Sequence, residues 1–274
     1  MTHHLYALLV GINRYDKRSQ ISWLQGCTND AGAMKTYLET RVASAKTQLH
    51  VRMLLDEQAT RQAVIDGFRQ HLQQAKGGDT ARFYYAGHGA QDRVPEAFWP
   101  IIPSRLNETL VCYDSRTEGS WDLADKELAE LIAEVGKQNP HITIVLDCCH
   151  SGSGTRGDGS APFARRRTPG DQRDRPAESF LLSAQRLEAV EKAYGEKASS
   201  TTSVRTRGLN DSTAGWHLPQ GRHVLMAACR DTEEASEYQA HGRPCGAFSH
   251  FLLDTLQKTN SLLTYRDLFN STAA

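Results

Sequence analysis

Residues 5–12, Leu-Tyr-Ala-Leu-Leu-Val-Gly-Ile, form an unbroken apolar run that ends at Asn13. Such a run suits a central strand of a parallel sheet, because a strand of this kind is covered on both faces. Apolar residues at helical spacing follow over 30–42, and extended character returns over 49–55. This part of the chain therefore predicts a strand, helix, strand unit.

The same alternation continues along the rest of the chain. Thr60 is a suitable N-cap for a helix that Gly77-Gly78 would stop, and 81–86 is the next strand pattern. Helix and strand patterns then alternate over 122–135, 142–146, 223–229 and 246–256. We expect an α/β fold, a doubly wound and mostly parallel sheet flanked by helices.

The pattern fails between residues 153 and 221, where Gly, Ser, Arg, Pro and Asp dominate as far as Pro176. We predict a long inserted linker there, with one helix over 180–194. The chain is then a single domain over 1–274, made of a large segment 1–152, the linker 153–221 and a small segment 222–274. The helix pattern at 265–269 runs close to the last residue, which is typical of a short helix or of a chain that continues in a longer protein.

Composition excludes several classes of function. Lys plus Arg and Asp plus Glu each number 32, so net charge gives no reason to expect nucleic acid or a membrane surface as partner. No apolar run reaches the roughly 18 residues that span a bilayer, and the start lacks a signal-peptide pattern, so we expect a cytoplasmic protein. The six cysteines lack C-x-x-C spacing, which favours reduced thiols and leaves room for a reactive one.

Two predicted strand ends carry reactive side chains, F-Y-Y-A-G-H-G at 83–89 and V-L-D-C-C-H-S-G at 145–152. Ligands of open parallel sheets bind outside the carboxyl ends of the strands, so His88 and a cysteine would meet there if the strands are neighbours. An unperturbed thiol has a pKa of about 8.5 and needs an imidazole to become a good nucleophile. Cys148 and Cys149 face opposite sides of the sheet, and only one of them can face His88.

Acyl transfer also requires donors for the developing oxyanion, and the backbone N–H groups of Gly89 and Cys149 are the candidates on these turns. Protonated His88 would then give its proton to the leaving amine.

The blocks Y-Y-A-G-H-G and D-C-C-H-S-G resemble the catalytic pair of the metacaspases and related prokaryotic caspase-like peptidases of the peptidase C14 type. Further matches are A-L-L-V-G-I-N at 7–13, G-C-T-N-D at 26–30, A-A-C-R at 227–230 and G-A-F-S at 246–249. The similarity covers most of the chain outside the linker. It implies a caspase-like fold and a cysteine endopeptidase in which Cys149, followed by His-Ser-Gly, is the nucleophile and Cys148 is a buried small hydrophobe.

The resemblance also implies a preference for a basic residue at P1, the residue before the cleaved bond, because Asp30 and Asp147 match the acidic positions of the first subsite. A partly desolvated pair of carboxylates is a good partner for Arg or Lys and a poor one for a substrate Asp. Asp30 would equally serve as the N-cap of the helix that follows it. Ala86 stands where metacaspases often have Ser, which leaves the choice between Arg and Lys open.

If P1 is basic, the linker offers candidate processing sites that we expect to be exposed, namely Arg165, Arg166, Arg167, Arg173 and Arg175. Cleavage there, by the chain itself or by an upstream protease, would resemble caspase-type maturation. A solvated loop that is never cut explains the same residues. Expected partners are protein or peptide substrates, and no cofactor is required. The resemblance also allows calcium, which some metacaspases use through acidic surface clusters, although this sequence has no defined loop for it.

Three rival functions are weaker. A zinc site built from Cys148, Cys149, His150 and His88 is disfavoured, because adjacent residues reach three tetrahedral corners with difficulty. A serine hydrolase would require G-x-S-x-G, which the sequence lacks. A non-catalytic caspase-like interaction module would be marked by loss of His88 or Cys149, and both are present.

Overall fold

The computed structural model describes residues 2–44, 46–99, 104–149, 164–181, 223–229, 235–259 and 263–272. At its centre is a five-stranded sheet in the order β2-β1-β3-β7-β8, in which every neighbouring pair is parallel. Its strands are β1 (His3–Gly11), β2 (Thr47–Leu55), β3 (Thr80–Ala86), β7 (His141–Asp147) and β8 (His223–Ala227). The expected α/β fold with a mostly parallel sheet is confirmed.

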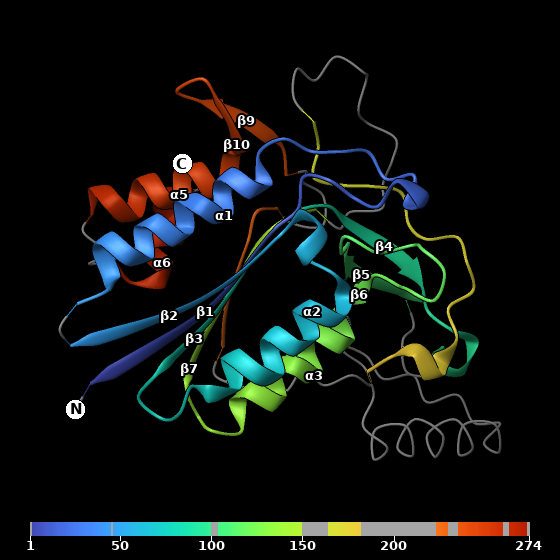
Figure 1. The fold of residues 1–274 in the computed structure, drawn as a ribbon, viewed down its shortest axis with the longest axis horizontal. Helices are drawn as coiled ribbons and strands as arrows, with labels where there is room; N and C mark the ends of the chain where they lie inside the picture. Colours follow the sequence, from blue (N-terminus) through green and yellow to red (C-terminus); the bar gives the residue numbers. More distant parts are fainter. Residues whose placement is uncertain are drawn as a thin grey trace, which may run out of the picture.

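Helices cover both faces of this sheet (Figure 1). One face carries α1 (Cys27–Tyr37), α5 (Ala247–Lys258) and α6 (Tyr265–Thr272), and the other carries α2 (Arg61–Asp66) and α3 (Asp125–Gly136). As predicted, Thr60 caps α2, because its side chain accepts a hydrogen bond from the N–H of Ala63. Helices α1 and α2 each continue in a π-helical turn, over Leu38–Val42 and Gly67–His71. Short 3₁₀ turns lie at Lys17–Ser19, Asp56–Gln58, Leu72–Gln74, Glu96–Phe98 and Ala177–Ser179.

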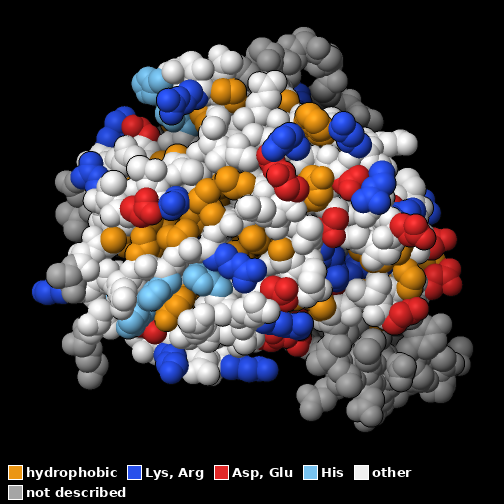
Figure 2. Space-filling model, viewed as in Figure 1, with side chains coloured by type: hydrophobic (Ala, Val, Ile, Leu, Met, Phe, Trp, Pro, Cys, Tyr) orange, Lys and Arg blue, Asp and Glu red, His pale blue; other side chains and the backbone are white. Residues whose placement is uncertain are grey.

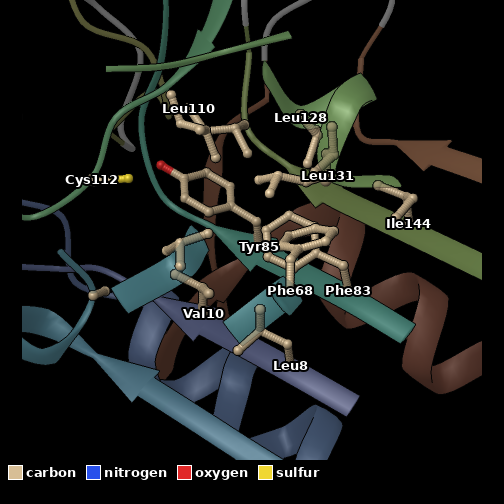
Figure 3. Close-up of a cluster of buried hydrophobic side chains, with 14 of the residues drawn as sticks. Leu8, Val10, Phe68, Phe83, Tyr85, Leu110, Cys112, Leu128, Leu131 and Ile144 are labelled. Carbon is tan, nitrogen blue, oxygen red and sulfur yellow. The ribbon is translucent and has the colours of Figure 1, made fainter. Parts of the chain in front are cut away.

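Side chains of the central strands alternate between two apolar cores. In β3, Phe83 and Tyr85 pack into the core beneath α2 and α3, whereas Tyr84 and Ala86 pack into the core beneath α1 and α5. Figure 3 shows the first core, where the rings of Phe83 and Tyr85 meet Phe68 and residues of the neighbouring elements. Because the strands are buried on both faces, they lack the polar alternation of a half-exposed sheet.

Two smaller β structures flank the carboxyl ends of the parallel strands (Figure 1). A three-stranded antiparallel sheet contains β4 (Gly89–Arg93), β5 (Leu106–Leu110) and β6 (Leu123–Ala124). A hairpin contains β9 (Glu237–Ala240) and β10 (Arg243–Gly246). The sequence predicted neither, and the helix expected from residue 122 begins at Asp125 because β6 precedes it.

The described part of the predicted linker, 164–181, packs on the body of the protein. Arg166 is 0% exposed and Arg175 is 7% exposed, so the expectation of exposed arginines is wrong at these positions. Gly170 lies so close to the carbonyl oxygen of Gln91 that a Cβ would overlap it. The helix predicted over 180–194 lies outside the described residues beyond Leu181.

Surface charge follows the balanced composition. Basic and acidic side chains are intermixed over the face shown in Figure 2 and do not gather into a patch of one sign. Among the helices that the structure describes, none has the length and apolar character needed to cross a bilayer.

Candidate active site

Adjacent strands bring the two predicted catalytic segments together. Strands β3 and β7 pair in parallel, with Ala86 opposite Asp147 at their last position. The chain therefore leaves the sheet side by side toward His88 and toward Cys149, as the sequence predicted. Gly87 is required at this turn, because a Cβ there would overlap the hydroxyl of Tyr85.

Hydrogen bonds fix the orientation of His88, which is 1% exposed. Its ring Nε2 donates to the backbone carbonyl oxygen of Ser22 at 2.9 Å, and the backbone N–H of His88 donates to the hydroxyl of Tyr15 at 2.7 Å. A proton on Nε2 leaves the lone pair on Nδ1. This Nδ1 is buried and has no hydrogen-bond partner among the described residues. Burial lowers the pKa of His88 to about 4, so the ring is neutral near pH 7 and can accept a proton.

The two adjacent cysteines have different surroundings. Cys148 is buried in the apolar core with Ile144 and Leu146, and burial raises the pKa of its thiol. As expected, it is a small buried hydrophobe. Cys149 is also buried, and its backbone N–H donates to the linker. A third cysteine, Cys229, follows β8 and donates to the carbonyl of Cys148, with 3.4 Å between the sulfur and the oxygen. The neighbouring thiol of Cys149, together with burial, raises the pKa of Cys229.

Both N–H groups predicted as oxyanion donors point at one carbonyl oxygen. The N–H of Gly89 donates to the oxygen of Arg166 at 3.0 Å, and the N–H of Cys149 donates to the same oxygen at 3.1 Å. Such a pair of converging backbone donors is the arrangement that stabilises an oxyanion during acyl transfer.

The linker segment 164–168 is held in extended form across this site. The backbone N–H of Arg166 donates to the carbonyl oxygen of Ala235 at 2.9 Å, and the backbone N–H of Glu237 donates to the carbonyl oxygen of Ala164 at 2.8 Å. After Arg166 in the chain, the backbone N–H of Thr168 donates to the carbonyl oxygen of Gly89 at 3.1 Å. The backbone on both sides of Arg166 is therefore paired as a bound peptide strand would be.

The side chain of Arg166 enters an acidic pocket formed by Asp30, Asp147 and Glu237. Its Nη2 lies 2.5 Å from Asp30 Oδ2, its Nη1 lies 2.9 Å from Asp147 Oδ2, and Glu237 Oε1 is 3.8 Å from Nη2. All four side chains are almost completely buried. Burial raises the pKa of Asp30 to about 7, and the charge of Arg166 opposes part of that rise.

Asp30 is not a helix N-cap, so that alternative is wrong. Helix α1 begins at Cys27 with Gly26 as its N-cap residue, which places Asp30 inside the helix. Its carboxylate accepts hydrogen bonds from Arg166 and from the N–H of Gly246 instead.

Glu237 is a pocket residue that the sequence did not single out. Its carboxylate also accepts the N–H groups of Gln25 and Gly26. The sequence offered one signal for Glu237, its position shortly after the A-A-C-R block at 227–230. The segment around it carries no motif that would single it out.

The remaining candidate arginines make other contacts. Arg175 pairs with the buried Glu127 at 2.9 Å and lies over the ring of Phe180. Arg173 pairs with Asp171 at 2.6 Å. Arg165 and Arg167 flank Arg166, and their backbones form isolated β-bridges with Ser236 and Gly89, respectively. Of the candidates, Arg166 is the one whose guanidinium the structure places between Asp30 and Asp147.

The described residues include no group of three His, Cys, Asp or Glu side chains that could hold a metal ion.

Comparison with known proteins places the chain in a family. A family model described as the metacaspase, peptidase C14 domain, matches residues 6–156. The chain is 23% identical over 279 residues to Metacaspase-1 of Mycosarcoma maydis, covering 97% of this chain and 65% of that protein. It is 30% identical over 153 residues to Metacaspase-1 of Plasmodium falciparum, covering 54% of this chain and 24% of that protein.

The fold is similar to the crystal structure of protein GSU0716 from Geobacter sulfurreducens. The TM-score is 0.60 at 22% identity, and the match covers 98% of this chain and 88% of that one. The chain spans less than two thirds of the length of the two curated relatives named above. Since the family model matches more than half of the residues, the chain belongs to the metacaspase family, the peptidase C14 domain.

Proposed function

We propose that this chain is a cysteine endopeptidase that cleaves peptide bonds after arginine, with Cys149 as nucleophile and His88 as proton-transfer partner. One observation carries the proposal: the carbonyl oxygen of Arg166 accepts the N–H groups of Gly89 and Cys149 while its guanidinium lies between acidic side chains. A peptide bound for cleavage after arginine would make these same contacts.

The reaction follows from the positions of the donors and acceptors. Neutral His88 takes the thiol proton of Cys149 on Nδ1, and the thiolate attacks the carbonyl carbon of the P1 residue. The N–H groups of Gly89 and Cys149 stabilise the oxyanion. Protonated His88 then gives its proton to the leaving amine, and the C–N bond breaks to leave a thioester on Cys149. Water, deprotonated by His88, hydrolyses this thioester and regenerates the thiol.

The acidic pocket supports selection of arginine over lysine and rejection of acidic residues. The guanidinium of Arg166 reaches Asp30 through Nη2 and Asp147 through Nη1. A lysine ammonium is a single point charge and cannot present two nitrogens at that fixed separation. A substrate carboxylate would bring a fourth negative group into a buried site.

The Arg166–Arg167 bond is the processing site that the geometry favours. Segment 164–168 belongs to the same chain as the catalytic residues, which supports cleavage in cis rather than by another protease. While the bond is intact, Arg166 occupies the pocket that a substrate arginine would need. We therefore propose that the uncut chain is a zymogen.

The test compares the parent chain with Cys149→Ala and with its matched neighbour Cys148→Ala on fluorogenic peptides ending in Arg, Lys or Asp. We expect hydrolysis after Arg by the parent and by Cys148→Ala, and none by Cys149→Ala. Mass spectrometry of the purified chain should give a fragment ending at Arg166 whose yield does not depend on dilution. Activity that survives Cys149→Ala, or a preference for Asp, contradicts the proposal. A parent chain inactive on every peptide and never cut would instead favour a non-catalytic interaction module.

A further inference from the structure

We infer that Ser249 and Tyr84 form a buried hydroxyl relay that fixes the carboxylate of Asp147 and thereby makes the acidic pocket prefer a guanidinium to an ammonium. The inference rests on the proposed function, since it concerns how the same pocket selects its P1 residue. Neither hydroxyl would touch the reacting atoms, so both residues position the pocket and do not take part in the chemistry.

The relay has a defined direction. The hydroxyl of Ser249 donates to Asp147 Oδ2 at 2.5 Å, and the hydroxyls of Tyr84 and Ser249 lie 2.5 Å apart. Ser249 has a single hydroxyl proton, which the carboxylate accepts, so Tyr84 must be the donor in the second contact. Burial raises the pKa of Tyr84, which keeps this donor protonated. Hydrogen bonds joined in this way polarise one another and hold the final acceptor more firmly.

The backbone at the start of α5 completes the support. The N–H of Ser249 donates to the same Asp147 Oδ2 at 3.1 Å, and the N–H of Gly246 donates to Asp30 Oδ2 at 2.9 Å. A Cβ at Gly246 would overlap both the Asp147 carboxylate and the guanidinium of Arg166. Residues 246–249, the G-A-F-S block of the sequence, thus hold both aspartates in place.

Loss of the relay should affect two basic side chains unequally. Asp147 Oδ2 lies between the donors of Ser249 on one side and Arg166 Nη1 on the other, while Oδ1 has no hydrogen-bond partner among the described residues. Without the hydroxyl, Oδ2 keeps the N–H of Ser249 and the contact with Arg166 Nη1, and the carboxylate is held less firmly in its orientation. A guanidinium must meet Asp30 and Asp147 at a fixed spacing and loses a contact when one acceptor turns. An ammonium can follow the displaced charge.

The experiment measures kcat and KM for a matched pair of peptides that differ only in Arg or Lys at P1, using the full chain with Ser249→Ala or Tyr84→Phe. For Ser249→Ala we expect kcat/KM on the Arg peptide to fall about tenfold or more, the size expected for a hydrogen bond to a charged group. The fall should come mainly from KM, and the Lys peptide should lose much less. Tyr84→Phe keeps the serine and should change the Arg to Lys ratio in the same direction by a smaller factor.

Thermal unfolding of each variant separates this effect from a loss of fold. Equal losses on both peptides would show a merely structural role and would overturn the inference. If Ser249→Ala does not fold, Tyr84→Phe decides the matter, since an unchanged Arg to Lys ratio there refutes the relay. A parent chain without any preference for basic P1 residues would refute the proposed function itself. A parent that prefers Arg, together with variants that keep its ratio, would refute the relay alone.

Discussion

Removing the guanidinium that fills the acidic pocket should open the site to external ligands. In a Cys149→Ala chain the linker cannot be cut by the proposed mechanism, so Arg166 stays in place. Adding Arg166→Ala removes the partner of Asp30 and Asp147. Truncating one member of a buried, hydrogen-bonded charge pair costs about 3–5 kcal/mol. Held only by its backbone hydrogen bonds, segment 164–168 would then occupy the site far less often.

The size of the effect follows from competition within the chain. The apparent dissociation constant of a ligand is its intrinsic value divided by the fraction of molecules in which the site is open. If the equilibrium between the closed and the open site shifts by about 3 kcal/mol toward the open form, the open fraction rises roughly 100-fold, as long as the site is mostly closed. We therefore expect a fluorescent peptide ending in Arg to bind the double variant roughly 100-fold more tightly than Cys149→Ala alone, as measured by anisotropy.

A matched control is Arg165→Ala in the same Cys149→Ala background, because Arg165 neighbours Arg166 in an extended segment, where successive side chains point to opposite sides. This control should leave the affinity close to that of Cys149→Ala. Equal affinities for the Arg166 and Arg165 variants would refute the claim that the Arg166 side chain closes the pocket.

Two further predictions concern stability. The pKa of Asp30 is raised to about 7 in the folded protein, so the folded state binds this proton more tightly than the unfolded state does. The resulting contribution to stability is complete below about pH 4 and is lost as the pH rises to about 7. Urea unfolding of Cys149→Ala at pH 5 and pH 8 should therefore differ by more than in the same chain with Asp30→Asn, and an equal difference would contradict the assignment. Arg175→Ala leaves the buried Glu127 with Arg61 as its remaining ion-pair partner and should lower the free energy of unfolding by about 3 kcal/mol. Lys258→Ala, whose side chain is 72% exposed where it pairs with Asp254, should cost less than about 1 kcal/mol, and similar losses for the two variants would refute the distinction.

The central sheet could be predicted because its strands are covered on both faces. Strands such as β1 and β7 consist mainly of apolar residues, and this pattern requires no knowledge of distant contacts. Strand β4 reads Gly-Ala-Gln-Asp-Arg and has no such signal. It forms because its backbone pairs with β5, across a separation that local patterns do not encode.

The meeting of the two candidate catalytic segments was predictable for the same reason that the sheet was, since they follow two neighbouring strands. The pocket was predictable only in part. Asp30 suited a cap or a pocket equally well until the start of α1 at Cys27 decided the matter. The choice of Arg166 among neighbouring arginines depends on backbone pairing with residues 235–237, which lie about seventy positions away in the chain.

The acidic pocket takes Asp30 and Asp147 from before the Arg166–Arg167 bond and Glu237 from after it. A cut at that bond would leave these groups in two polypeptides held together by the pairing of β7 with β8. The intact chain can refold in a first-order process, but the cut protein would have to find its other half in solution. Its recovery after unfolding would then depend on concentration, and in dilute solution each unfolding event would end the working life of that molecule.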